Sequence, residues 1–119
     1  MQVRINKSET TITAYLSGDI DHHSAKPIRE EIDNEIDDFK PSLLVLDFGE
    51  VTFMDSSGIG LVMGRFRKMQ TLGGEIQIAN TPLYISKVMR ISGIEKLAKI
   101  TNKGETNEST KWVKNNNSI

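Results

Sequence analysis

Two short polar segments carry the side chains best suited to chemistry or recognition. Asp55-Ser56-Ser57-Gly58 stands between an apolar run and a stretch with helical spacing, and Asp21-His22-His23-Ser24 precedes another helical stretch. Aspartate and serine are favoured at helix N-termini, where a side-chain oxygen accepts an otherwise unpaired backbone N–H. The sequence therefore predicts that two hydroxyl groups are displayed where a strand passes into a helix, at the positive end of the helix dipole.

These hydroxyl groups lack the surroundings of a catalytic serine. A nucleophilic serine needs a base within reach, and the spacing around Asp55-Ser56 does not match the G-x-S-x-G nucleophile elbow. His22 and His23 are the only histidines and there is no cysteine. Adjacent residues in a loop seldom bind one metal. We expect no catalytic residue, no metal site and no cofactor, and helix capping is the simplest role for the two serines.

Composition indicates one folded domain. The chain has 119 residues, of which 37% are hydrophobic and 26% charged. A formal net charge of −1 gives no reason to expect direct binding of nucleic acid. No signal peptide is visible, and no apolar run approaches the roughly 18–20 residues that span a membrane. We expect a cytoplasmic protein without a membrane partner.

One strand and one helix must position the serines. Residues 43–48 are almost continuously apolar, which is typical of a strand buried on both faces. Residues 49–55 are turn-prone, and we expect Val51, Phe53 and Met54 to point into the core. Three- and four-residue steps then predict a helix. Its inner face would hold Ile59, Val62, Met63, Phe66, Met69 and Gln70.

The chain before the central strand predicts a hairpin and a helix. Residues 1–6 and 11–16 have the alternating and β-branched character of paired strands, with 1–6 at the sheet edge, and 17–24 form a loop. A helix begins near Ser24. Its apolar stripe consists of Ile28, Ile32, Ile36 and Phe39. Pro27 fits the first turn of this helix, and Pro41 marks its end.

The chain after the central helix continues the alternation. A glycine turn at 73–74 leads to a strand over 75–79, a helix that starts at Pro82 and stops at Ser92-Gly93, and a short strand over 97–101. The inner face of that helix would hold Ile85, Val88 and Met89. Residues 103–119 form a polar C-terminal segment, with a brief helix over 106–113 that packs Trp112 and Val113 inward and a frayed tail over 115–118.

The order of elements, β-β-α-β-α-β-α-β, predicts the α/β class. Residues 1–102 would form one mixed sheet of four to five strands with helices mainly on one side. Functional loops in such folds gather at strand ends. The sequence therefore predicts that the 17–24 and 49–57 loops lie close together.

Four motifs in order resemble a known family, the anti-sigma factor antagonists, which are single STAS domains. The motifs are Gly18-Asp19-Ile20-Asp21-His22-His23-Ser24, Phe53-Met54-Asp55-Ser56-Ser57-Gly58-Ile59-Gly60, Gly64-Arg65-Phe66-Arg67 and Ser92-Gly93. The resemblance covers about residues 1–101 and is greatest to antagonists that act in the second stage of sporulation in spore-forming bacteria.

The resemblance implies a phosphorylation switch and no enzymatic activity. The unphosphorylated protein would bind an anti-sigma factor that is a serine kinase of the histidine-kinase-like ATPase fold, and so free the sigma factor. Phosphorylation of Ser56 would end binding, and a PP2C-type phosphatase would restore it. The partner-binding residues implied in this way are Asp21, His22, Ser24, Asp55, Ser56, Ser57, Gly58, Ile59, Gly60 and Arg65.

Several residues keep a second interpretation. Asp21 suits a helix cap as well as a partner contact. Gly58 and Gly60 allow either close packing on the sheet or close approach of a partner. Arg65, with Arg67 and Lys68, suits either a phosphate or acidic partner, or a solvated helix face. One of the two histidines is expected to pack or to form a hydrogen bond, and the other to lie at the surface.

One alternative function stays open at this point. The domain would be a STAS accessory module that binds lipid or nucleotide in a transporter-associated complex.

Overall fold

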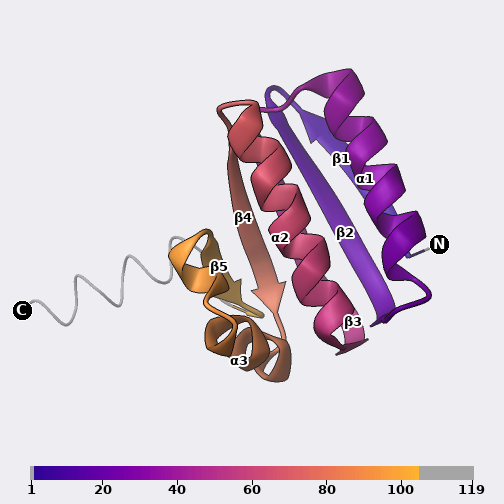
Figure 1. The fold of residues 1–119 in the computed structure, drawn as a ribbon, viewed down its shortest axis with the longest axis vertical. Helices are drawn as coiled ribbons and strands as arrows, with labels where there is room; N and C mark the ends of the chain where they lie inside the picture. Colours follow the sequence, from indigo (N-terminus) through magenta and orange to yellow (C-terminus); the bar gives the residue numbers. More distant parts are fainter. Residues whose placement is uncertain (1, 105–119) are drawn as a thin grey trace, which may run out of the picture.

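A five-stranded mixed sheet organises the fold (Figure 1). The computed structural model describes residues 2–104. The strands lie side by side in chain order: β1 (Val3–Ser8), β2 (Thr11–Ile20), β3 (Leu43–Met54), β4 (Glu75–Thr81) and β5 (Lys99–Asn102). The helices are α1 (Ala25–Phe39), α2 (Ser56–Thr71), α3 (Leu83–Ile91) and the 3₁₀ turn η1 (Ile94–Lys96).

The pairing of the strands explains where the helices lie. β1 is antiparallel to β2, whereas the pairs β2–β3, β3–β4 and β4–β5 are parallel. Parallel neighbours need crossover connections, which are almost always right-handed, so successive crossovers in one direction place their helices on one face. Figure 1 shows α1 and α2 side by side over the sheet, with α3 beyond the end of β4. The predicted α/β class and one-sided mixed sheet are confirmed.

The core lies between the sheet and the two long helices. Of the predicted stripe on α1, Ile28, Ile32 and Ile36 are buried, whereas Phe39 is partly buried and packs against the core. Alternate residues of the strands are buried as well. The described helices cover only one of the two faces of β3. Leu44 and Leu46 face the core, whereas Leu43 and Val45 are partly exposed. The expectation of burial on both faces is therefore wrong for this strand.

Two strands are longer than predicted. β2 continues to Ile20 and β3 to Met54, although residues 17–24 were expected to be a loop and residues 49–55 a turn-prone segment. Register shifts between Tyr15 and Ser17, and again between Gly18 and Asp19, let the two strands stay paired past their irregular residues. Because β3 remains extended, its side chains alternate. Met54 is buried, and Phe53, expected in the core, is 44% exposed.

Smaller differences concern the helix faces and the C-terminus. On α2, Val62 and Met69 are buried as predicted, but Gln70 is exposed and the predicted face omitted Leu61 and Arg65. On α3, Ile85 and Met89 are buried, whereas Val88 is only partly so. The predicted helix over 106–113 lies outside the described residues. No helix within residues 2–104 has the length and apolar character needed to cross a membrane.

Candidate functional site

The two polar segments meet because β2 and β3 are parallel and end together. Asp19 is paired with Phe53, and Ile20 with Met54. The backbone N–H of Asp55 donates to the Ile20 carbonyl at 3.2 Å, and the Thr52 hydroxyl donates to the Asp19 carboxylate at 2.8 Å. The predicted proximity of the two segments is confirmed.

Asp21 and Ser24 fix the turn that leads into α1. The Asp21 carboxylate accepts from the backbone N–H of His23 at 2.9 Å and of Ser24 at 3.0 Å. The Ser24 hydroxyl donates to the Asp19 carbonyl and accepts from the Asp21 N–H, both at 2.9 Å. The pKa of Asp21 is lowered, first because the Ser24 N–H stabilises its charged form. Asp21 thus holds the turn before α1 and is not the helix cap that was one of its two interpretations, because the N-cap residue is Ser24 and no side chain caps this helix.

Asp55, rather than either serine, caps α2. Its backbone is extended, and its carboxylate accepts from the Ser57 N–H at 2.8 Å. Ser56 is the first residue of the helix and is exposed, whereas Ser57 is half-buried. Helix capping, the simplest role expected for the serines, is therefore carried out by their neighbour. The Ser56 hydroxyl is presented to solvent at the helix N-terminus.

Gly58 and Gly60 differ sharply in their surroundings. Gly58 is buried, and a Cβ at that position would overlap the Met54 side chain and lie 3.5 Å from Ile20 Cγ2. Gly60 is exposed and has no atom within 4 Å of an added Cβ. Close packing is therefore the structural reason for Gly58 alone. Ile59, between them, is half-buried and packs against the core.

Gly58→Ala and Gly60→Ala form a matched pair for a stability measurement. We expect Gly58→Ala to destabilise the fold by about 1–3 kcal/mol, because the methyl group overpacks a buried methionine. Gly60→Ala should be neutral or stabilise by up to about 1 kcal/mol, since alanine is the better helix former and the space is open. Urea unfolding of both variants measures the difference. Equal midpoints would show that the α2–β3 contact yields freely to the extra methyl group.

Arg65 lies inside the protein, not on a solvated helix face as one interpretation had it. It is 6% exposed, its Nε is 2.8 Å from the Asp33 carboxylate on α1, and its Nη1 donates to the Leu61 carbonyl at 3.3 Å. The Nε–H does not point along the line to the carboxylate, so the contact is ionic rather than an aligned hydrogen bond. Burial lowers the pKa of Arg65, against the opposing effect of Asp33. Its immediate role is to join α1 to α2.

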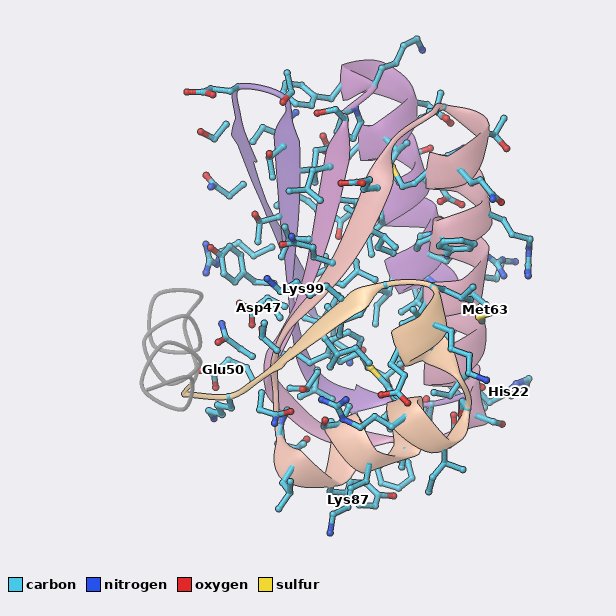
Figure 2. The ribbon with its side chains drawn as sticks, turned by 90° about the vertical axis from the view of Figure 1, so that its left-hand side faces the viewer. His22, Asp47, Glu50, Met63, Lys87 and Lys99 are labelled. Atoms are coloured by element: carbon cyan, nitrogen blue, oxygen red, sulfur yellow. The ribbon has the colours of Figure 1, made fainter. Side chains whose placement is uncertain are left out.

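A surface pocket of about 580 Å³ lies where α1 and α2 begin. From α2 it is lined by Ser57, Gly60 and Leu61, and from the α1 side by His22, His23, Ala25, Lys26 and Arg29. The two imidazole rings are exposed and meet edge to face, with centroids 5.4 Å apart. Neither ring packs inside the protein, so the packing alternative expected for one of these histidines is wrong. Figure 2 shows His22 on the helix side of the sheet, opposite Asp47 and Glu50.

Sequence reasoning missed Lys26 and Arg29. A signal for them exists, because residues 22–29 contain His22, His23, Lys26 and Arg29 and no acidic residue. On a helix, positions three apart lie on the same face. Of the predicted partner-binding residues, the pocket gathers His22, Ser57 and Gly60. Ser24, Asp55 and Ser56 lie beside it on the same two segments, whereas Gly58 and Arg65 are buried.

Comparison with known proteins identifies the family to which this fold belongs. The STAS domain family matches residues 2–107. The chain is 33% identical over 84 residues to an "Anti-sigma F factor antagonist" from Lysinibacillus sphaericus, covering 71% of this chain and 72% of that protein. It is also similar to two solved structures. One is the "Anti-Sigma Factor Antagonist SpoIIAA in its Unphosphorylated Form" (TM-score 0.74, 27% identity, 98% and 97% of the two chains).

The second similar solved structure is the "Bacillus Cell Fate Determinant SpoIIAA in the Phosphorylated Form" (TM-score 0.68, 28% identity, 91% and 95% of the two chains). The sheet order, the paired polar segments and these similarities all point to one assignment. The chain belongs to the STAS domain family.

Proposed function

We propose that this protein is an anti-sigma factor antagonist switched by phosphorylation of Ser56. The unphosphorylated form binds an anti-sigma factor serine kinase and so frees the sigma factor to activate transcription. A PP2C-type phosphatase removes the phosphate and restores binding. The observation that carries the proposal is the exposed Ser56 hydroxyl at the first residue of α2, with its helix capped by Asp55 instead. Relatives of this chain bear the antagonist name, and SpoIIAA has been solved in both forms.

The kinase-binding surface in this proposal consists of the accessible residues of the two polar segments. These residues are Asp21, His22, Ser24, Asp55, Ser56, Ser57, Ile59 and Gly60. Gly58 and Arg65 are buried and support the surface from within. The protein acts here as ligand and phosphate acceptor, and the kinase supplies the catalytic groups.

Repulsion at the interface explains how one phosphate would end binding. A phosphoserine carries about −1.5 to −2 charges at neutral pH. At position 56 that charge would join three carboxylates, those of Asp19, Asp21 and Asp55, on the surface that meets the kinase. A partner surface that fits a neutral hydroxyl would have to bury an unpaired charge, which costs several kcal/mol.

The same phosphate should leave the fold intact. It would sit at the N-terminus of α2, where the helix dipole favours negative charge by about 0.3–1 kcal/mol. We expect amide NMR shifts on phosphorylation to be confined to residues 19–24 and 52–61. Core strand residues such as Leu44 and Leu46 should keep their positions in the spectrum. Shifts that spread through the sheet would contradict a switch by repulsion and indicate refolding instead.

A further inference from the structure

The pocket between the starts of α1 and α2 is lined by basic side chains and by no acidic one. The basic side chains are those of His22, His23, Lys26 and Arg29. All four side chains are exposed. The formal charge of the whole chain is −1, so this positive concavity is not a general property of the surface. It lies beside the residue proposed to accept phosphate.

Three nearby carboxylates are held by partners other than Lys26 and Arg29. Asp21 accepts two backbone N–H groups of its own turn, and Asp55 accepts the Ser57 N–H. Asp33 contacts Arg65 at 2.8 Å. Within residues 2–104, neither Lys26 nor Arg29 forms an ion pair. Two long, exposed cationic side chains therefore lie at the pocket with no ion-pair partner within residues 2–104.

The helix geometry brings Ser56 to the edge of this pocket. Ser56 and Gly60 are four residues apart on α2, so they lie on the same face one turn from each other, roughly 5–6 Å between Cβ positions. Gly60 lines the pocket and has no side chain, which leaves the path along this face open. Ser56 itself does not line the pocket, so a phosphoryl group on it would lie about one helical turn from Gly60, and the long side chains of Lys26 and Arg29 would have to reach toward it.

We propose that this pocket is a phosphoryl-binding site, with Lys26 and Arg29 as the residues that hold the group. The inference rests on the proposed role of Ser56. The phosphoryl group has two possible sources: phospho-Ser56 of the same chain, or a phosphate supplied from outside it. In the first case Lys26 and Arg29 offset only part of the phosphate charge, and with Asp19, Asp21 and Asp55 nearby the modified surface stays more negative than the unmodified one.

The test reads the charge state of the phosphate directly. Phosphoserine is installed at position 56 during synthesis, and ³¹P NMR follows its second ionisation against pH. Phosphoserine ordinarily titrates near pH 6, and nearby cations lower a pKa because they favour the charged form. In Lys26→Gln/Arg29→Gln we expect the phosphate pKa to rise by about 0.5–1 unit relative to the unsubstituted protein. The helix N-terminus is the same in both proteins, so it cancels from the comparison.

Lys87→Gln/Lys96→Gln is the matched control. It removes the same formal charge from α3 and η1, and Figure 2 shows Lys87 pointing away from the helices α1 and α2. Its ³¹P titration should coincide with that of the unsubstituted protein. All of the substituted side chains are exposed, so each variant should fold, and amide spectra would verify this.

A second titration identifies the source of the group. Inorganic phosphate added to the unphosphorylated protein should shift the amide signals of residues 22–29 and 57–61. If phospho-Ser56 fills the pocket, these shifts vanish in the modified protein; if they persist, the pocket takes its phosphoryl group from outside. Absence of shifts in the unphosphorylated protein, together with unchanged ³¹P curves in the double variant, would overturn the proposal. Because phosphoserine is installed without a kinase, failure of a kinase to modify Ser56 would count against the proposed function alone.

Discussion

Ser56→Ala is expected to abolish phosphate uptake from the anti-sigma factor kinase, while Ser57→Ala retains it. Ser56 is exposed at the first residue of α2, whereas Ser57 is half-buried and its N–H is held by Asp55. Intact-mass measurement after incubation with kinase and ATP would report one added phosphate for the unsubstituted protein and for Ser57→Ala, and none for Ser56→Ala. Uptake by Ser56→Ala would refute the assignment of the acceptor.

The binding consequence of phosphorylation should be just as large. Burial of an unpaired phosphate beside Asp21 and Asp55 would cost several kcal/mol, and each 1.4 kcal/mol is a factor of ten in affinity. We expect the affinity for the kinase to fall by about 10²–10³-fold, as calorimetry of the two forms would show. Ser56→Ala should bind about as well as the unphosphorylated protein. If the kinase binds both forms equally and transfers no phosphate, the accessory-module function becomes the better explanation.

The periodic parts of the chain were predictable because burial imposes a strict pattern on them. Ile28, Ile32 and Ile36 recur every four residues and all face the sheet, and the proline and glycine signals marked where α1 and α3 begin or end. The parallel order of the strands also follows from helices placed between them. That order brings the two polar segments together, so the position of the site could be predicted from the sequence.

The remaining features depend on tertiary contacts that no local pattern encodes. β2 and β3 extend through glycine-containing segments because each supplies hydrogen-bond partners to the other, and this pairing turns Phe53 outward. Arg65 is a charged residue on a helix, for which exposure is the usual outcome. Its burial requires Asp33, which lies 32 positions earlier and becomes a neighbour only when α1 and α2 pack together. The basic pocket likewise draws on two helices, so its shape is a property of their packing.

Asp33→Ala is expected to destabilise the protein far more than Asp37→Ala. Both carboxylates lie on α1 and contact a cation on α2, Asp33 with Arg65 at 2.8 Å and Asp37 with Lys68 at 2.7 Å. Arg65 has 7% of its side chain exposed and would keep a buried charge without a counterion, whereas the Lys68 and Asp37 side chains are 30% and 63% exposed. Because Asp33 itself is 27% exposed, we discount the usual cost of breaking a buried pair to about 2–3 kcal/mol. Asp37→Ala should cost less than about 1 kcal/mol.

Arg65→Met separates the charge of Arg65 from its packing. Methionine keeps much of the buried volume and removes the charge that needs Asp33. The unpaired Asp33 side chain is 27% exposed and so partly open to water, although its Oδ1 is buried. We expect Arg65→Met to cost less than Asp33→Ala, and Asp33→Ala to become nearly neutral in the Arg65→Met background. Urea unfolding of the unsubstituted protein, the two single variants and the double variant gives the coupling free energy between Asp33 and Arg65, which should be about 2 kcal/mol. Because Arg65 is inside the protein, Arg65→Met should also leave kinase affinity unchanged. A loss of affinity without a loss of stability would restore Arg65 as a partner contact.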